Sequence, residues 1–353
     1  MSARLIRMFL FVLIMTGALK LNAQDIFEVE KGYYATRKID MAVVRLDQRK
    51  RLQIRAAEGL RGNITLIGEE RSSVSITYSK QARAANRSMA IDYIDLISVS
   101  AKELPDRVVL SLKAPNPPPW NSETEAGLID MNIILPSDFT VDLEATYFSV
   151  QTEGRLESLS STNSLGSFEI EGITGSLTLS TKNQRITLDS ITGKINVSTT
   201  NATIRASNIF SSSDPAVFTN EGGAIDIEGF AGQLNARNKF GRVAITDFSL
   251  YGDANFVRCT SGPVEIKLSG ANEGQLVINN RYEDINLTVP DTLAAYFSLS
   301  VDEDGKIEVV GLPFTADLIE QDRLNLISGN GTVEIVSSIR GKGNIYVTGI
   351  KGD

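Results

Sequence analysis

The feature that most constrains this chain is a short unit that recurs from about residue 160 to the C-terminus. Each unit has a turn residue, usually Asn, followed within a few residues by two apolar residues that flank one polar residue. Nine copies can be identified, and successive copies lie 18 to 26 residues apart, a spacing typical of solenoid repeats. Their first apolar residues are Phe168, Ile186, Ile204, Ile225, Val243, Val264, Ile285, Ile307 and Val333.

A second set of apolar pairs lies between these units, so each repeat holds at least two strands. The alternation has a period of two, which predicts strands with one face inward and one in solvent, and helical spacing is nowhere sustained. One repeat alone buries too little apolar surface to offset its loss of chain entropy, so the repeats must stack. The sequence therefore predicts an all-β fold, a parallel β-solenoid or β-helix of about nine or more coils of roughly 18–26 residues. The second set begins at Leu177, Ile195, Leu234, Leu276, Leu324 and Ile345.

Residues 24–160 are also β-rich but less regular, and they lead into the repetitive part, residues 161–353. Apolar pairs that begin at Ile54, Ile64 and Val74 are spaced 10 residues apart, which indicates that the solenoid begins here.

Two shorter features interrupt this N-terminal part. Residues 97–99 and 108–112 flank Pro105 and Asp106 and are predicted to form a hairpin. Residues 114–120 hold a run of prolines that excludes a central strand, because proline lacks the ladder donor. We expect an exposed loop there, with a recognition peptide for a partner as the alternative.

Residues 1–23 have the pattern of a secretory signal peptide. Arg4 and Arg7 precede an apolar run that is too short for a comfortable membrane span, and Ala23 offers a small residue at a plausible cleavage point. An uncleaved anchor is the alternative. We expect an exported protein with no membrane span after cleavage, located in the periplasm, the outer envelope or outside the cell.

Charge and composition narrow the function classes. Loss of residues 1–23 would move the formal charge from −8 to −11, because this segment holds three basic residues and no acidic one. Such acidity argues against nucleic acid or an anionic lipid surface as the main partner. The chain has no histidine and a single cysteine, which excludes an internal disulfide, His-based nucleophile systems and the usual zinc ligand sets.

The strand end from Asp130 to Pro136 and serial units such as Gly166 to Gly175 follow the signal-like segment. In this combination the chain resembles the bacterial putative-adhesin family of unknown function, which is related to putative autotransporter-adhesin head domains. The resemblance covers nearly the whole mature chain. It implies an envelope β-solenoid, and it supplies no functional residues to carry over.

No catalytic, cofactor-binding or metal-binding residue is assigned from the sequence. Asp302 and Asp304 belong to the densest acidic cluster, which we interpret as a solvated turn, with a calcium site as the alternative. The pair Glu283 and Asp284 is interpreted in the same way. Cys259 is expected to point inward as a small buried apolar residue, in the position that Ala236 occupies in its repeat.

The recurrent Asn residues are expected to form turns, because Asn tolerates left-handed backbone conformations. Stacked in successive coils they would also form an internal amide ladder, with ligand binding as the alternative. The residues in question are Asn183, Asn201, Asn220 and Asn238.

Three functions remain open. The first is a non-catalytic, adhesin-like surface protein that binds an extracellular or envelope polysaccharide or protein along its outer faces. The second is a carbohydrate-active enzyme, which needs paired carboxylates in a cleft. Clefts on a solenoid are usually built from long inserts, and here the sizeable insert lies between Leu312 and Asn330. The third is a structural or regulatory periplasmic component.

Overall fold

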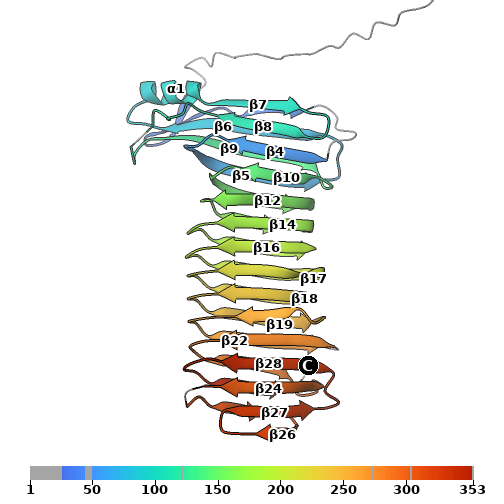
Figure 1. Ribbon diagram of the computed structural model, residues 1–353. Coiled ribbons are helices and arrows are strands. Elements are labelled where there is room, and N and C mark those ends of the chain that lie inside the picture. Colours follow the sequence, from blue (N-terminus) through green and yellow to red (C-terminus); the bar gives the residue numbers. More distant parts are fainter. Residues whose placement is uncertain (1–25, 44–49, 121, 272, 303, 352–353) are drawn as a thin grey trace, which may run out of the picture.

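The computed structural model describes residues 26–43, 50–120, 122–271, 273–302 and 304–351. Within them nearly all regular structure is β-strand, with one α-helix, which confirms the all-β prediction. The strands belong to one continuous hydrogen-bonded sheet that is folded into a tall stack (Figure 1). None of the helical structure in the described ranges is long and apolar enough to cross a membrane.

One side of the stack, which we call row A, is a series of mostly parallel strands. Successive strands pair in register at the repeat spacing, so that Phe168 lies opposite Ile186 and Ile186 lies opposite Ile204. In spatial order row A contains β9 (Ala126–Pro136), β5 (Leu60–Glu69), β11 (Tyr147–Gly154), β13 (Phe168–Glu171), β15 (Ile186–Thr192), the first halves of β17 (Ile204–Asn220) and β18 (Ile225–Asn238), β19 (Val243–Leu250), β21 (Val264–Ala271), β23 (Ile285–Pro290), β29 (Ile345–Ile350) and β25 (Ile307–Val310).

The other side, row B, is built in the same way, and each coil of the stack consists of one strand from each row. The two long strands β17 and β18 bend through a corner and contribute to both rows. In spatial order row B contains β8 (Val108–Lys113), β4 (Arg51–Ala56), β10 (Thr140–Glu144), β12 (Leu156–Ser164), β14 (Ile173–Thr181), β16 (Lys194–Thr199), the second halves of β17 and β18, β20 (Asn255–Arg258), β22 (Gly274–Asn280), β28 (Val333–Ile339) and β24 (Ala295–Val301).

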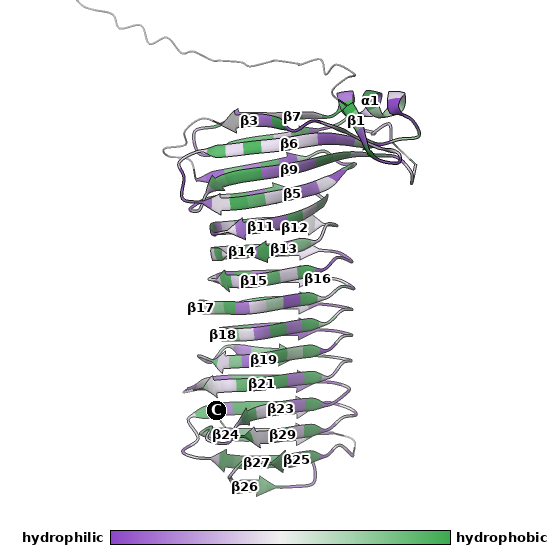
Figure 2. Ribbon diagram, turned by 180° about the vertical axis from the view of Figure 1, so that it is seen from behind, coloured by the Kyte–Doolittle hydropathy of each residue, from purple (hydrophilic) through white to green (hydrophobic). Residues whose placement is uncertain are grey.

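The core lies between the rows and consists of the alternate residues of each strand. In β15, Ile186 and Leu188 are buried, whereas Thr187 between them lies on the outer side. Figure 2 shows this alternation as apolar and polar bands along strand after strand. The period-two pattern therefore predicted the inward residues of the central coils correctly.

The corner that follows row A requires a left-handed backbone. Gly172 has φ 75°, and the corresponding residues of the next two coils, Ser190 and Asn208, both have φ 55°. The bend turns the following apolar residue inward, where Ile191 lies opposite Ile209. Small or amide side chains occupy these positions because they tolerate positive φ.

The coils do not stack in the order of the sequence. After β22 and β23 the chain continues into β24 and β25, which do not pair with β22 and β23 but lie two coils further along the stack. The last two strands of the sequence, β28 and β29, form the coil between them. β28 pairs with both β22 and β24 (Figure 1), and β29 pairs with both β23 and β25 (Figure 2). The last coil of the sequence is therefore an interior coil of the stack.

The N-terminal end has the same kind of insertion. The coil made by β4 and β5 lies between the coil of β8 and β9 and the coil of β10 and β11. Both ends of the stack are thus closed by a coil that is out of sequence order.

Antiparallel strands cover the two ends. At the C-terminal end, β27 (Arg323–Ser328) pairs with β24, and β26 (Thr315–Ile319) pairs with β27. The insert between Leu312 and Asn330 is therefore an end cap. At the N-terminal end, β7 (Ser98–Glu103) pairs with β8 as the predicted hairpin. On the row A side, β6 (Val74–Arg83) pairs with β9, β2 (Tyr33–Thr36) and β3 (Ile39–Val43), and β1 (Ile26–Glu30) pairs with β2.

A helix, α1 (Arg87–Leu96), lies at the N-terminal end, so the expectation that helical spacing is absent was wrong. Asn86 caps it by accepting a hydrogen bond from the Met89 amide, and Ala90, Tyr93 and Ile94 are buried. Their i, i+3, i+4 spacing is the helical signal that the β pattern of the surrounding chain obscured. Lys80 secures the other end, because its Nζ donates to the carbonyls of Ile94 and Ile97 at 3.1 and 2.9 Å.

Four predicted strand positions need correction. The pairs that begin at Val74 and Leu324 lie on β6 and β27, which are antiparallel strands of the end caps. The ninth copy, at Val333, lies in row B, and Ile345 lies in row A, the reverse of the predicted sets. The error follows from the insertion of the last coil, which shifts the phase of the two sets.

The proline-rich segment before β9 is anchored to the core. Trp120 is 6 % exposed, donates to the Gly59 carbonyl at 2.9 Å and packs edge-on against Tyr93. The prediction of an exposed loop therefore holds for Asn116 and Pro117 and is wrong for Trp120.

Candidate functional site

The outer face of row A carries one continuous line of side chains. Glu169 lies opposite Thr187, Ala244 opposite Glu265, and Glu265 opposite Asn286, so the line stays in register from coil to coil. Stacked strands lie about 4.8 Å apart, so the line presents a new side chain at that interval along the whole stack. From β9 to β25 the line is Asn132, Thr65, Gln151, Glu169, Thr187, Arg205, Asp226, Ala244, Glu265, Asn286, Tyr346 and Glu308.

Carboxylates on this face are partly used to join coils. Asp189 accepts hydrogen bonds from the Ser207 hydroxyl at 2.6 Å and the Asn208 amide at 2.9 Å. The Ser207 bond is the main cause that lowers the pKa of Asp189 below its ordinary value. Arg242 likewise pairs with Asp226 at 2.9 Å.

A line of polar side chains runs inside the corner that follows row B. Its members are buried and bind backbone carbonyls of the corner, including those of the preceding coil. Asn238, for example, donates to the carbonyls of Gly223, Gly241 and Arg242 at 2.7, 2.8 and 3.1 Å. The buried members include Ser164, Thr181, Thr199, Asn220, Asn238, Cys259 and Asn280.

The four predicted Asn residues therefore divide into two pairs. Asn220 and Asn238 are internal, but they bind backbone carbonyls and do not form an amide-to-amide ladder. Asn183 and Asn201 are turn residues with φ 58°, and a bond of 3.0 Å joins their side chains on the outside. The internal amides hold the corners together.

Cys259 belongs to this internal line. It is 2 % exposed, which confirms the predicted burial. The residue that lies opposite Ala236 is Val257, however, so Cys259 occupies in its coil the position that Asn238 occupies in the neighbouring coil. Its thiol donates to the Gly241 carbonyl at 3.3 Å, and burial raises its pKa. The residue stands where neighbouring coils carry Asn.

The predicted acidic candidates are turn residues. Asp304 has φ 61°, and the amide of Gly305 binds the Asp302 carbonyl at 3.2 Å. Asp284 accepts from the Asn344 amide at 2.7 Å, while Glu283 has φ 81° in the same corner. Within the described ranges, no three His, Cys, Asp or Glu side chains gather as metal ligands would. Glu303 lies outside the described residues.

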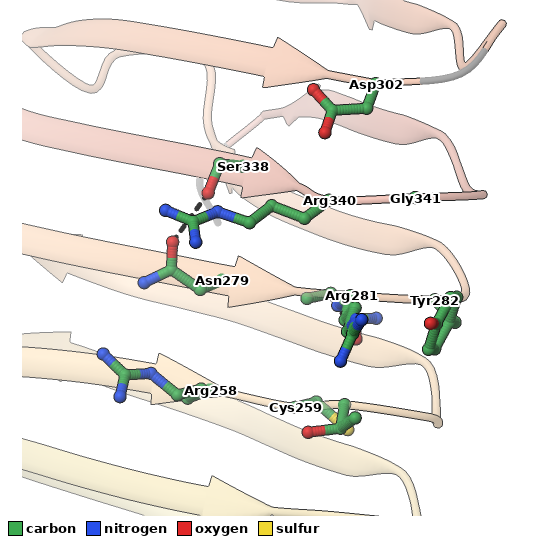
Figure 3. A pocket seen from close by; sticks show the side chains of 11 residues that line it. Arg258, Cys259, Asn279, Arg281, Tyr282, Asp302, Ser338, Arg340 and Gly341 are labelled. Atoms are coloured by element: carbon green, nitrogen blue, oxygen red, sulfur yellow. Dashed lines mark hydrogen bonds between the residues drawn. The ribbon is translucent and has the colours of Figure 1, made fainter.

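An open cavity of about 660 Å³ lies over the corner that follows row B, in the C-terminal third of the stack. Three arginines line it, Arg258, Arg281 and Arg340, and they come from β20 and from the corners after β22 and β28 (Figure 3). Asp302 stands at one border, and Ser338 donates to the side chain of Asn279 at 2.6 Å across the floor. The insertion of the last coil is what brings Arg340 beside Arg281.

Two aromatic side chains stand at the same corner. Tyr282 is 41 % exposed and Phe240 is 59 % exposed. The guanidinium of Arg281 lies 5.2 Å from the centre of the Tyr282 ring, and the Lys239 ammonium lies 5.0 Å from the centre of the Phe240 ring. Cations above aromatic faces are held in place by the ring quadrupole.

Interpretation of the sequence missed this group. Arg237, Arg258 and Arg281 recur close to the repeat period, so a search for cations at that spacing would have found these three. Arg340 gives no such signal, because its coil is out of sequence order.

Neither a family model nor a curated protein matches this sequence. Among solved structures, a putative cell adhesion protein from Clostridium sporogenes is similar over 89 % of this chain and 99 % of its own, with 9 % identity and a TM-score of 0.21. A putative adhesin from Parabacteroides merdae covers 88 % and 95 %, with 9 % identity and a TM-score of 0.29. One from Bacteroides fragilis covers 88 % and 97 %, with 11 % identity and a TM-score of 0.24. At these scores the likeness carries no argument about residues or ligands. The solved structures similar to this chain are thus described as putative adhesins or as a putative cell adhesion protein, in keeping with the putative-adhesin family that its sequence resembles.

Proposed function

We propose that this chain is a non-catalytic, adhesin-like binding scaffold, an exported β-solenoid that presents the outer faces of its two rows to a polymer or a protein outside the cytoplasm. The observation that carries the proposal is the in-register line of outward side chains on row A, which extends from Asn132 to Glu308. A regular interval of side chains suits a ligand that itself repeats.

The construction of the stack supports this function. Buried polar side chains tie corners to the coil before them, and out-of-order coils close both ends. A rigid face loses little conformational entropy on binding, so many weak contacts add up to a useful affinity.

The test incubates the purified chain with a panel of polysaccharides, cell-wall fractions and envelope proteins, and measures both retention and product release. Retention without release is the expected result. Release of reducing ends or unsaturated sugars would replace the proposal with a carbohydrate-active enzyme. Neither retention nor release would favour the structural or regulatory role.

A matched pair of variants identifies the face. Ala244→Arg places a bulky charge on the outer face of row A, and Thr178→Arg does the same on row B, both near the middle of the stack. Loss of retention in one variant and not in the other locates the ligand. Full retention in both would contradict binding along the middle of either face.

A further inference from the structure

The strongest unexplained surface is a group of five cations, which we call the basic cluster: Arg237, Lys239, Arg258, Arg281 and Arg340. We propose that the basic cluster binds an acidic polysaccharide, one whose carboxylates or sulfates contact the guanidinium groups. This inference rests on the proposed function and deepens it by naming a ligand class and a site.

The cluster follows the axis of the stack. Arg237 lies opposite Arg258 on neighbouring strands of row B. Arg281 and Arg340 each directly follow residues that lie opposite one another, Asn280 and Ile339. Four adjacent coils therefore carry at least one cation each, and at about 4.8 Å per coil the array spans roughly 15 Å. That length matches a few sugar units of a chain running along the stack.

The arginines are available to a ligand. Among the residues that the structure describes, no carboxylate forms an ion pair with Arg258, Arg281 or Arg340, although several other surface cations are paired. Arg237 donates its Nε to the side chain of Asn235, and its terminal nitrogens have no partner among the residues that the structure describes. A planar guanidinium is suited to bidentate contact with a carboxylate or a sulfate.

The acidic groups around the cluster are few. Glu221 stands at the corner beside Phe240, Glu283 lies in the corner that carries Arg281, and Asp302 stands beyond Arg340. On a chain whose formal charge is −8, an unpaired group of cations is a local reversal of sign. Such a reversal attracts an anionic ligand to this place and not to the rest of the surface.

The aromatic side chains favour a sugar. Tyr282 presents a partly exposed ring and a hydroxyl beside the arginines, and Phe240 presents a second ring two coils away, beyond the corner of Thr260 and Ser261. An aromatic ring offers an apolar surface to the C–H groups of a pyranose, while its hydroxyl accepts or donates a hydrogen bond.

Density of charge distinguishes an acidic polysaccharide from nucleic acid. Duplex DNA carries one negative charge per ~1.7 Å of its axis, and it is held by extended basic surfaces. Five cations on an acidic chain would leave most of those phosphates facing a repulsive surface. An acidic polysaccharide has more widely spaced charges, which the array can match.

The experiment measures binding of the full exported chain to polygalacturonate and to the same polymer with its carboxylates methyl-esterified. The test variant is Arg258→Gln/Arg281→Gln/Arg340→Gln. The control variant, Lys31→Gln/Lys102→Gln/Lys113→Gln, removes the same charge from exposed residues of the N-terminal end. Thermal melting of both variants establishes that they are folded, and a duplex DNA fragment and heparin are measured in parallel.

We expect polygalacturonate to bind, the esterified polymer to bind at least tenfold more weakly, and affinity to fall as salt rises. The test variant should lose at least tenfold in affinity, while the control variant keeps the wild-type value. Heparin binding by the same residues would support sulfate as an equivalent anion.

Equal binding of the two polymers, or an unchanged test variant, would overturn the inference and leave the proposed scaffold function intact. Tighter binding of DNA than of either acidic polysaccharide would replace the ligand class with nucleic acid. If no polymer of the wider panel is retained, the proposed function fails together with this inference.

Discussion

The order of the coils can be tested with one matched pair of substitutions, Ile345→Ala and Ile307→Ala. The two residues lie opposite one another in row A, on the last strand of the sequence and on the last strand of the row. Ile345 is 0 % exposed and lies between β23 and β25, whereas Ile307 is half-buried at the free edge.

The magnitudes follow from these positions. Replacing Ile by Ala removes three carbons, or about 2.4 kcal/mol of transfer free energy at ~0.8 kcal/mol per buried methylene. Strands on both sides hold the space around Ile345 open, and the resulting cavity raises the cost to about 3–4 kcal/mol. Around Ile307 solvent reaches the side chain already, so we expect a loss of about 1 kcal/mol.

Urea unfolding followed by circular dichroism measures both losses as changes in the free energy of unfolding. Stacking in sequence order would make β29 the outermost strand, and Ile345 would then be the cheaper residue to truncate. A loss for Ile345→Ala equal to or smaller than that for Ile307→Ala would therefore refute the inserted coil.

Four further outcomes are expected. Ile186→Asp should destabilise the protein by several kcal/mol, because it buries a carboxylate without a partner. Thr187→Asp on the outer face should change the melting temperature little, and equal effects of the two substitutions would refute the period-two assignment. Asn238→Ala should cost about 3 kcal/mol by leaving corner carbonyls without donors, against less than about 0.5 kcal/mol for the exposed Asn196→Ala, measured by the same urea titration. Cys259 should not react with a thiol reagent at about pH 8 until the protein unfolds. Because burial raises its pKa, its contribution to stability should be present at neutral pH and be lost as the pH rises above the ordinary thiol range toward the folded pKa. Treatment with a chelator should leave the melting temperature unchanged, and a large drop reversed by calcium would contradict the interpretation of the acidic turns.

What the sequence determined by itself was local. The alternation of apolar and polar residues identified the inward faces of the central strands, and the spacing of turn residues identified the coils, because both depend on neighbours within one strand or one corner. The hairpin before residue 113 and the burial of Cys259 followed from the same patterns. The outward position between the two apolar residues of each unit, such as Thr187, followed from the same alternation.

Only the tertiary structure decided which coils are neighbours. Apolar pairs such as Val333 with Ile335 and Ile345 with Val347 are nearly interchangeable. The apolar pattern therefore shows which side chains of a strand point inward, but it does not show which other strand lies beside it. Two coils are inserted out of order, and this placed Arg340 beside Arg281 although the strands involved are far apart in the chain. The basic cluster thus depends on which coils pack against one another, and the repeat spacing of the sequence does not reveal this.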